Sequence, residues 1–180
     1  MGSVETIEPG TFTLADLDDL PDDGMRYELV DGTLLVTPAP LPIHQTAALE
    51  IGFRLRLHCP KDLKVFMAPT DFRPTTHRSL QPDVLVCRRA DVGPKAIHRS
   101  LLAVEVLSPA TRSKDLLFKR ALYEEAGVQS YWIVDPDREE LTVLELVAGR
   151  YVQRAKVRGK NAFTAELPFE VQIVPADLID

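Results

Sequence analysis

Two acidic residues stand inside apolar segments whose pattern predicts strands. Glu105 lies in LLAVEVL, residues 101–107, and Asp83 opens the apolar run of LQPDVLVC, residues 80–87. Side chains alternate between the two faces of a strand, and LLAVEVL is apolar on both, so this strand is expected to be central and Glu105 partly desolvated. A buried carboxylate is costly unless it has a cation, a proton or hydrogen-bond donors. Glu105 therefore needs a partner beside it.

The two carboxylates can converge on one face, near the strand ends, if these strands pair. Two carboxylates held that close repel each other unless a divalent cation bridges them or one keeps its proton. Mg²⁺ is typically held by one or two carboxylates, with water and substrate phosphate completing its octahedron, and Mn²⁺ suits the same ligands. The spacing therefore predicts a hard-metal site made by Asp83 and Glu105, for Mg²⁺ with Mn²⁺ as a substitute.

The next helical segment, residues 115–127, could supply a cation to this site. Asp115, Lys119 and Tyr123 follow each other at four-residue spacing and share one helix face, and a short return separates the segment from the strand of Glu105. Lys119 could orient or deprotonate a water there, or neutralise charge that builds on a phosphate. The alternative is a surface pair between Asp115 and Lys119.

Three more residues are accessory candidates. Glu28, in a hairpin strand, or Glu50, in the first long helix, could add a carboxylate, although a surface position is the ordinary expectation for either. His44 could position a phosphate or a water, or simply make a hydrogen bond at the start of that helix. Tyr131 and Trp132 are expected in the core and at its edge rather than stacked on bases.

The scaffold that must hold these residues begins with three elements. TFTLADLDDLPDDG predicts a short acidic helix that is capped by Thr13. RYELVDGTLLVTP predicts a hairpin that turns at Asp31-Gly32. HQTAALEIGFRLRLHC, residues 44–59, predicts a helix with one apolar face, made by Ala47, Ile51 and Leu55.

Strands and one further helix fill the rest of the chain. The helix at 115–127 is expected to be capped by Ser113 and stopped by Gly127. Strands are expected at residues 64–69, 80–87, 101–107, 129–135, 139–147 and 150–157, with a turn or loop at 76–79. This order predicts an α/β or α+β fold: a mixed central sheet with a helix packed on each side.

Composition predicts a single domain over residues 1–180, with residues 1–9 flexible. Hydrophobic residues make up 45% and charged residues 27%, as in soluble globular proteins. The sequence has neither an apolar run of membrane-spanning length nor a signal-peptide pattern, so we expect a cytoplasmic protein without a membrane partner. Cys59 and Cys87 have no metal-ligand spacing and are expected to be reduced and structural.

Charge is unevenly distributed along the chain. Residues 1–50 carry ten acidic side chains against one basic side chain, Arg26, whereas residues 88–120 carry eight basic and three acidic ones. Local potential governs binding more than the total charge of -6, so a nucleic-acid partner is compatible with this chain. A solvated charged surface is the plainer interpretation of the same basic cluster.

Taken in order, these motifs resemble the Uma family of restriction endonucleases, a branch of the PD-(D/E)xK nuclease superfamily. The resemblance covers roughly residues 10–150. It rests on the hairpin motif Tyr27 to Gly32, on His44, on Pro82-Asp83, on Glu105 to Pro109, on Asp115, Lys119 and Tyr123, and on Gly127 to Pro136. It implies a restriction-endonuclease-like mixed central sheet flanked by helices, with Asp83 and Glu105 as metal ligands and the Val106 carbonyl as a third.

The resemblance further implies a Mg²⁺-dependent endonuclease that hydrolyses phosphodiester bonds in nucleic acid, DNA being expected. One position departs from the superfamily: its usual E-x-K motif would put lysine at position 107, where this chain has Leu107, and Lys119 is the natural substitute. The alternative is a catalytically inactive nuclease-fold module that binds nucleic acid or protein, or a Glu105 that is only structural and pairs with Arg112 or Lys119. A homodimer through an edge strand near the C-terminus is a further expectation.

Overall fold

The structure is a computed structural model of the chain and describes residues 5–7, 10–37, 39–108 and 115–180. Pro109, which ends the motif that begins at Glu105, lies outside the described residues. So do Arg112, the alternative partner of Glu105, and Ser113, the expected helix cap.

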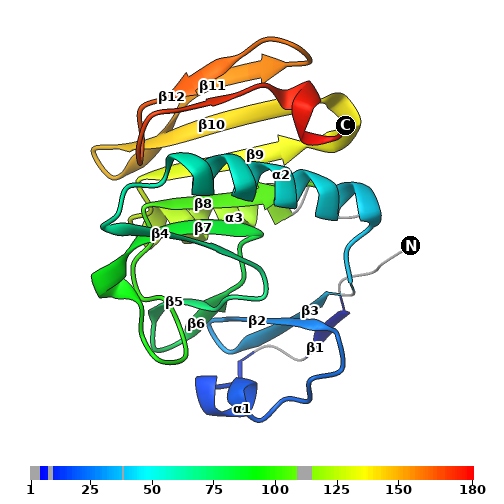
Figure 1. The fold of residues 1–180 in the computed structure, drawn as a ribbon. Coiled ribbons are helices and arrows are strands. Elements are labelled where there is room, and N and C mark those ends of the chain that lie inside the picture. The colour runs from blue at the N-terminus through cyan, green and yellow to red at the C-terminus, as the bar shows by residue number, and fades with distance from the viewer. Residues whose placement is uncertain (1–4, 8–9, 38, 109–114) are drawn as a thin grey trace.

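A six-stranded mixed sheet forms the centre of the molecule (Figure 1). Its strands β8 and β9 are parallel, and all its other neighbours are antiparallel. In spatial order the strands are β11 (Arg150–Arg158), β10 (Glu140–Val147), β9 (Ser130–Asp135), β8 (Leu102–Val106), β7 (Val84–Arg88) and β4 (Leu63–Met67). The strand that carries Glu105 is thus internal and buried along its whole length, as its two apolar faces predicted.

A helix covers each face of this sheet. Helix α2 (Pro42–His58) packs Ala47, Ile51 and Leu55 against one face, in the hydrophobic cluster that contains Trp132. On the opposite face, helix α3 (Asp115–Glu125) contributes Leu122 and Tyr123 to the cluster of Leu85, Ala103 and Tyr131. The predicted mixed sheet flanked by helices is therefore confirmed.

The ends of both helices follow local rules. Helix α2 begins at Pro42, two residues before the predicted start, since a proline is well suited to the first helical position. Gly127 follows α3 with a φ of +71°, the left-handed conformation that glycine adopts easily beyond a helix end.

A second sheet, which the sequence did not predict, lies beside the first. It is antiparallel, and its strands in spatial order are β1 (Glu5–Ile7), β3 (Thr33–Thr37), β2 (Arg26–Val30), β6 (Arg78–Leu80) and β5 (Phe72–Thr75). The β2–β3 hairpin turns at Asp31 and Gly32, with φ of 48° and 87°, as its Asp-Gly signal predicted. Three of the residues 1–9, which we expected to be flexible, pair with β3 as strand β1.

The segment Leu80–Cys87 divides between the two sheets, and this division creates the site described below. Leu80 ends β6 in the second sheet, whereas Val84 begins β7 in the first. Pro82, between them, has no N–H to offer a strand ladder. The prediction of one strand over residues 80–87 was therefore wrong. The turn or loop predicted at 76–79 is confirmed at residues 76–77, which join β5 to β6, but not at 78–79, where β6 begins.

Short elements complete the described chain. Helix α1 (Leu14–Asp18) is capped by Thr13 and covers the face of β2 that carries Leu29. The remaining elements are β12 (Phe163–Ala165), β13 (Val171–Ile173) and the single turns η1 (Arg89–Asp91), η2 (Pro136–Arg138) and η3 (Pro175–Leu178). Among the described residues, no helix combines the length and the apolar character needed to cross a membrane. Both cysteines are free thiols.

Candidate active site

Strands β7 and β8 bring Asp83 and Glu105 to the same edge of the central sheet. Their antiparallel register pairs Val84 with Val104, and Asp83, the residue before β7, accepts the amide of Val106, the residue after Glu105. The charge of Asp83 also acts on Glu105. Both carboxylates are buried, at 3% and 8% exposure. The structure therefore brings together the two residues that the sequence nominated as co-ligands.

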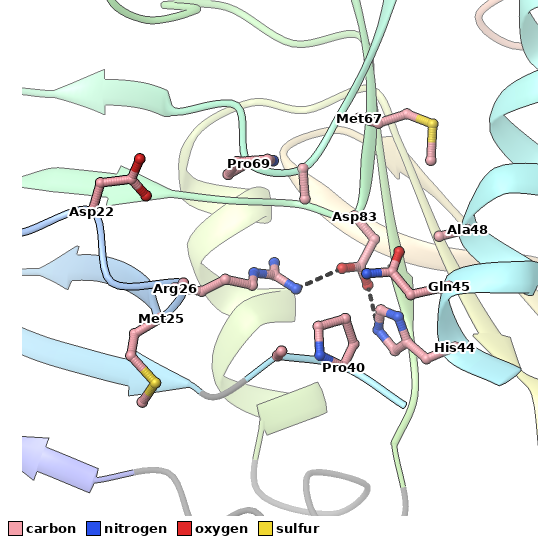
Figure 2. Close-up of a pocket in the computed structure, with 13 residues that line it drawn as sticks. Asp22, Met25, Arg26, Pro40, His44, Gln45, Ala48, Met67, Pro69 and Asp83 are labelled. Atoms are coloured by element: carbon pink, nitrogen blue, oxygen red, sulfur yellow. Dashed lines mark hydrogen bonds and ion pairs between the residues drawn. The ribbon is translucent and has the colours of Figure 1, made fainter. Parts of the chain in front are cut away.

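Asp83 is held by three donors, of which Figure 2 shows Arg26 and His44. Its Oδ1 lies 2.8 Å from Nη1 of Arg26, and its Oδ2 lies 3.2 Å from Nε2 of His44 and accepts the Val106 amide at 2.8 Å. Burial by itself would raise the pKa of Asp83, but the His44 hydrogen bond and the Arg26 charge outweigh it and hold the pKa below its usual value. Asp83 is therefore an ionised buried carboxylate.

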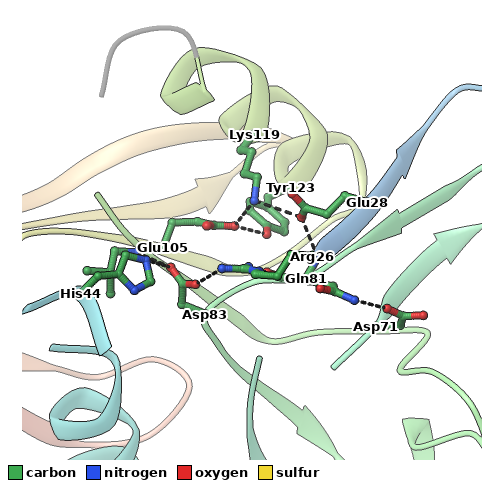
Figure 3. A network of polar contacts seen from close by, with 10 residues as sticks. Arg26, Glu28, His44, Asp71, Gln81, Asp83, Glu105, Lys119 and Tyr123 are labelled. Carbon is green, nitrogen blue, oxygen red and sulfur yellow. Dashed lines mark hydrogen bonds and ion pairs between the residues drawn. The ribbon is translucent and has the colours of Figure 1, made fainter. Parts of the chain in front are cut away.

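Glu105 is contacted by two side chains of α3, which Figure 3 shows pointing at it. Its Oε1 accepts the Tyr123 hydroxyl at 2.6 Å and the Lys119 ammonium at 3.0 Å. Burial raises the pKa of Glu105 above its usual value, and the Lys119 charge opposes that rise without cancelling it. The charge of Lys119 therefore does not fully offset the cost of burying the ionised form of Glu105.

Lys119 bridges two carboxylates. Its Nζ is 3.0 Å from Oε1 of Glu105 and 3.0 Å from Oε1 of Glu28, whose same oxygen also accepts the Gln81 amide at 2.7 Å. Although burial alone would lower the pKa of Lys119, the two carboxylates raise it, so the ammonium stays charged. The helical face predicted for Lys119 and Tyr123 therefore points inward, onto β8.

Of the two accessory glutamates, Glu28 lies in the cluster and Glu50 lies outside it. Glu28 is buried at 4% exposure within this cluster, so the expectation of a surface position was wrong for it; β2 is covered on both faces, which the hairpin pattern alone did not reveal. Glu50 lies on α2 and pairs with Arg54 one turn along, as a surface acid does. Glu50 does not join the cluster.

Asp115 and Val106 can be placed only in part. Asp115 is the first residue of α3, and its side chain is outside the described part of the structure. Val106 ends β8, and its amide binds Asp83, whereas a metal-ligand role for its carbonyl stays a prediction.

Arg26 is the site residue that sequence reasoning missed. Besides Asp83, it contacts the Gln81 carbonyl through Nη2, and its charge acts on Glu28 and Glu105. A signal was present, because Arg26 is the one basic residue among the first 50 and stands two positions before Glu28, on the same face of a strand.

A pocket of about 240 Å³ opens next to Asp83 (Figure 2). Arg26, His44 and Asp83 line its polar side, and apolar side chains such as Met25 and Met67 line the rest. Asp83 is therefore reached from this pocket, whereas Glu105 and Lys119 are not among the residues that line it.

These residues fit a hard divalent cation by their chemistry and their charge. Asp83, Glu105 and Glu28 bring three carboxylates to one cluster, against the two fixed positive charges of Arg26 and Lys119. Within the described ranges, no three His, Cys, Asp or Glu side chains are grouped as a complete ligand set. Mg²⁺ needs only one or two carboxylates beside water and phosphate, and a site for it at Asp83 and Glu105 stays a prediction.

The basic segment 88–120 is only partly near this site. Arg88 and Arg89 are exposed at the end of β7 opposite to Asp83, and Arg99 is exposed just before β8, at that same distant end. Lys119, by contrast, belongs to the cluster itself. The cations that surround the candidate metal ligands therefore come from β2 and α3 rather than from this exposed loop.

Comparison with known proteins agrees with this fold. The chain is similar to a crystal structure titled "a putative nuclease belonging to DUF820 from Anabaena variabilis", with 17% sequence identity and a TM-score of 0.70, over 93% of this chain and 97% of that one. No match was found among curated proteins. The model of the Uma2 family, described as "Putative restriction endonuclease", matches residues 14–177. Since that match spans nearly the whole chain, the protein belongs to the Uma2 family.

Proposed function

We propose that this protein is a Mg²⁺-dependent endonuclease that hydrolyses phosphodiester bonds in nucleic acid, with DNA as its substrate. The observation that carries the proposal is one buried cluster in which the charge of Asp83 acts on Glu105 and Lys119 reaches Glu105. The Uma2 family, described as "Putative restriction endonuclease", supports the proposal, because a nuclease would use such a cluster to hold a metal ion.

Each residue has a defined part in this proposal. Asp83 and Glu105, with the Val106 carbonyl, would hold Mg²⁺, which would supply an activated water and neutralise charge on the phosphate. Lys119 would orient that water and stabilise the charge that builds on the phosphate oxygens. Tyr123 and His44 are positioning residues, since each fixes one carboxylate through a hydrogen bond.

Lys119 would replace the lysine that the superfamily motif has at position 107, where this chain has Leu107. The superfamily lysine would come from the strand itself, two residues after Glu105, where this chain has the buried Leu107. The ammonium of Lys119 instead enters from α3 and lies 3.0 Å from Glu105. A lysine supplied by a helix can serve the same carboxylate because catalysis depends on where the charge is, not on which element carries it.

Plasmid nicking is the direct test of this function. Purified protein is expected to nick supercoiled DNA with Mg²⁺ or Mn²⁺, and Asp83→Ala or Glu105→Ala is expected to abolish nicking. Glu50→Ala is a matched control, because Glu50 is an acid outside the cluster. Unchanged nicking by both Asp83 and Glu105 variants would refute the assignment.

A non-catalytic module is the second candidate, and one observation favours it. The carboxylates of the cluster already have protein cations as partners, Arg26 for Asp83 and Lys119 for Glu28 and Glu105. Calorimetric titration separates the two functions: a catalyst binds Mn²⁺, whereas a module that uses these ion pairs only for structure does not.

The remaining parts of the proposal concern partners and place. Exposed Arg88, Arg89 and Arg99 would add phosphate contacts away from the site, which predicts salt-sensitive binding. Cutting both strands of a duplex requires two active sites, so a homodimer is proposed for that activity. Free cysteines suit a reducing compartment, and we propose the cytoplasm as the place of action.

A further inference from the structure

Arg26 is in contact with the carboxylate that the proposed metal would need. Its Nη1 lies 2.8 Å from Oδ1 of Asp83, and its charge also acts on Glu28 and Glu105. Arg26 reaches this position from β2 of the second sheet, whereas Asp83 and Glu105 belong to the first. Arg26 is therefore a cation of the second sheet that neutralises Asp83 beside the first sheet.

A guanidinium and a divalent cation repel each other when they share one carboxylate. Like charges a few ångströms apart inside a protein are strongly unfavourable, because little water screens them. Arg26 cannot escape by losing its proton, since arginine stays charged in proteins and the three carboxylates raise its pKa further. Metal binding at Asp83 thus requires the guanidinium of Arg26 to move.

The surroundings of Arg26 leave room for that movement. The side chain retains 16% exposure and lines the pocket of about 240 Å³ together with Asp83 and His44 (Figure 2). Its Nε is buried and has no hydrogen-bond partner among the residues that the structure describes. Arg26 is therefore held mainly by its Nη atoms, through Asp83 and the Gln81 carbonyl.

We propose that Arg26 is a displaceable counter-cation that competes with the divalent metal for Asp83. It stabilises the acidic cluster while metal is absent and turns into the pocket when metal binds, where its charge faces the nucleic-acid phosphate. This inference rests on the proposed metal site. It assigns a role to a residue outside the predicted ligand set, and it explains how a cluster with paired carboxylates can still accept a cation.

Calorimetric titration with Mn²⁺ tests the competition. Arg26→Gln is expected to bind Mn²⁺ about tenfold more tightly than the unsubstituted protein, within the range of coupling free energies by which one bound cation changes the affinity for another ligand. Arg26→Lys keeps the charge and is expected to stay close to the original affinity. Arg78→Gln is the matched control, because Arg78 lies on β6 beside β2 and pairs outward with Asp31 and Glu125.

A second measurement uses the unsubstituted protein and so does not depend on the folding of a variant. In a ¹⁵N spectrum of arginine side chains, addition of diamagnetic Mg²⁺ is expected to shift the Nε resonance of Arg26 and to leave that of Arg78 in place. Mg²⁺ binding without such a shift would overturn the inference.

The outcomes separate this inference from the function on which it rests. Equal Mn²⁺ affinity of Arg26→Gln and the unsubstituted protein, or weaker binding by the variant, would overturn the role of Arg26 and leave the metal site standing. Absence of Mn²⁺ binding in both proteins would overturn the metal site and the role of Arg26 together.

Discussion

Lys119 is a buried cation that pairs with two carboxylates. Its ammonium contacts Glu28 from β2 and Glu105 from β8, so one side chain neutralises carboxylates that come from two different sheets. Removing one partner from a buried ion pair is strongly destabilising, because the other charge is left without compensation. A structural and a catalytic contribution of Lys119 must therefore be measured separately.

Substitution of Lys119 by methionine is expected to reduce DNA nicking about 100-fold, the typical cost of removing one group that stabilises transition-state charge. Mn²⁺ binding should persist, since Asp83 and Glu105 are intact. Nicking rates and calorimetry measure the two effects, and circular dichroism verifies that the variant is folded. A variant that nicks at the original rate would assign Lys119 to structure alone.

Helix α2 has apolar side chains on both its buried face and its exposed face. Its inner residues Ala47, Ile51 and Leu55 are buried, and His44 on the first turn reaches Asp83. Its outer face carries another apolar series at four-residue spacing, Leu49, Phe53 and Leu57, with exposures of 59%, 55% and 64%. The two series are alike in sequence and differ only in what lies against them.

The inner and outer faces of α2 should differ in their effect on stability. Ile51→Ala is expected to destabilise the protein by about 2–5 kcal/mol, since it empties part of a packed core. Phe53→Gln on the same helix is expected to change the free energy of unfolding by about 0.5 kcal/mol or less. Denaturant unfolding measures both, and a large loss for Phe53→Gln would show that its exposed face is covered by a partner.

Elements with local signals could be predicted, whereas those made by distant pairing could not. The Asp31-Gly32 hairpin, α2 and α3 have turn residues or an apolar face within a few residues, and each was found close to its predicted place. Strand β6 is three residues long and lies between its sequence neighbour β5 and β2, about fifty positions away, and this second pairing has no local signal. Arg26 was missed for the same reason, since only that pairing brings β2 beside Asp83.

At the scale of the whole molecule, ion pairs tie the second sheet to its neighbours. Asp18 at the end of α1 accepts from Arg73 of β5 at 2.5 Å and from Lys95 of the loop after β7 at 2.8 Å. These hydrogen bonds lower the pKa of Asp18 from 3.8 to about 2. Three segments that lie far apart in sequence therefore share one carboxylate.

Asp18 should make stability depend on pH in acid. A carboxylate whose pKa is lower in the folded state stabilises the protein above its unfolded pKa, and this contribution is lost as the pH falls from about 4 towards 2. Because Asp18 is partly exposed, Asp18→Asn is expected to cost about 1 kcal/mol or less near neutral pH, roughly 2–4 °C in Tm. Thermal unfolding from pH 7 to pH 2 measures this, with Asp19→Asn as the exposed control. A difference that persists unchanged at pH 2 would contradict the explanation.

The segment Asp83–Arg88, which is strand β7 with the residue before it, has an acidic start and a basic end. Asp83 and Arg88 stand five residues apart along it, about 16 Å at roughly 3.3 Å per residue. Successive nucleotides of one strand in double-helical DNA rise by about 3.4 Å along the helix axis. A duplex whose axis ran along this segment, in contact with Arg88 and Arg89 while it was cut beside Asp83, would have about five nucleotides of one strand between the contact and the cut. Duplexes shorter than that interval would contact either the arginines or Asp83, but not both at once.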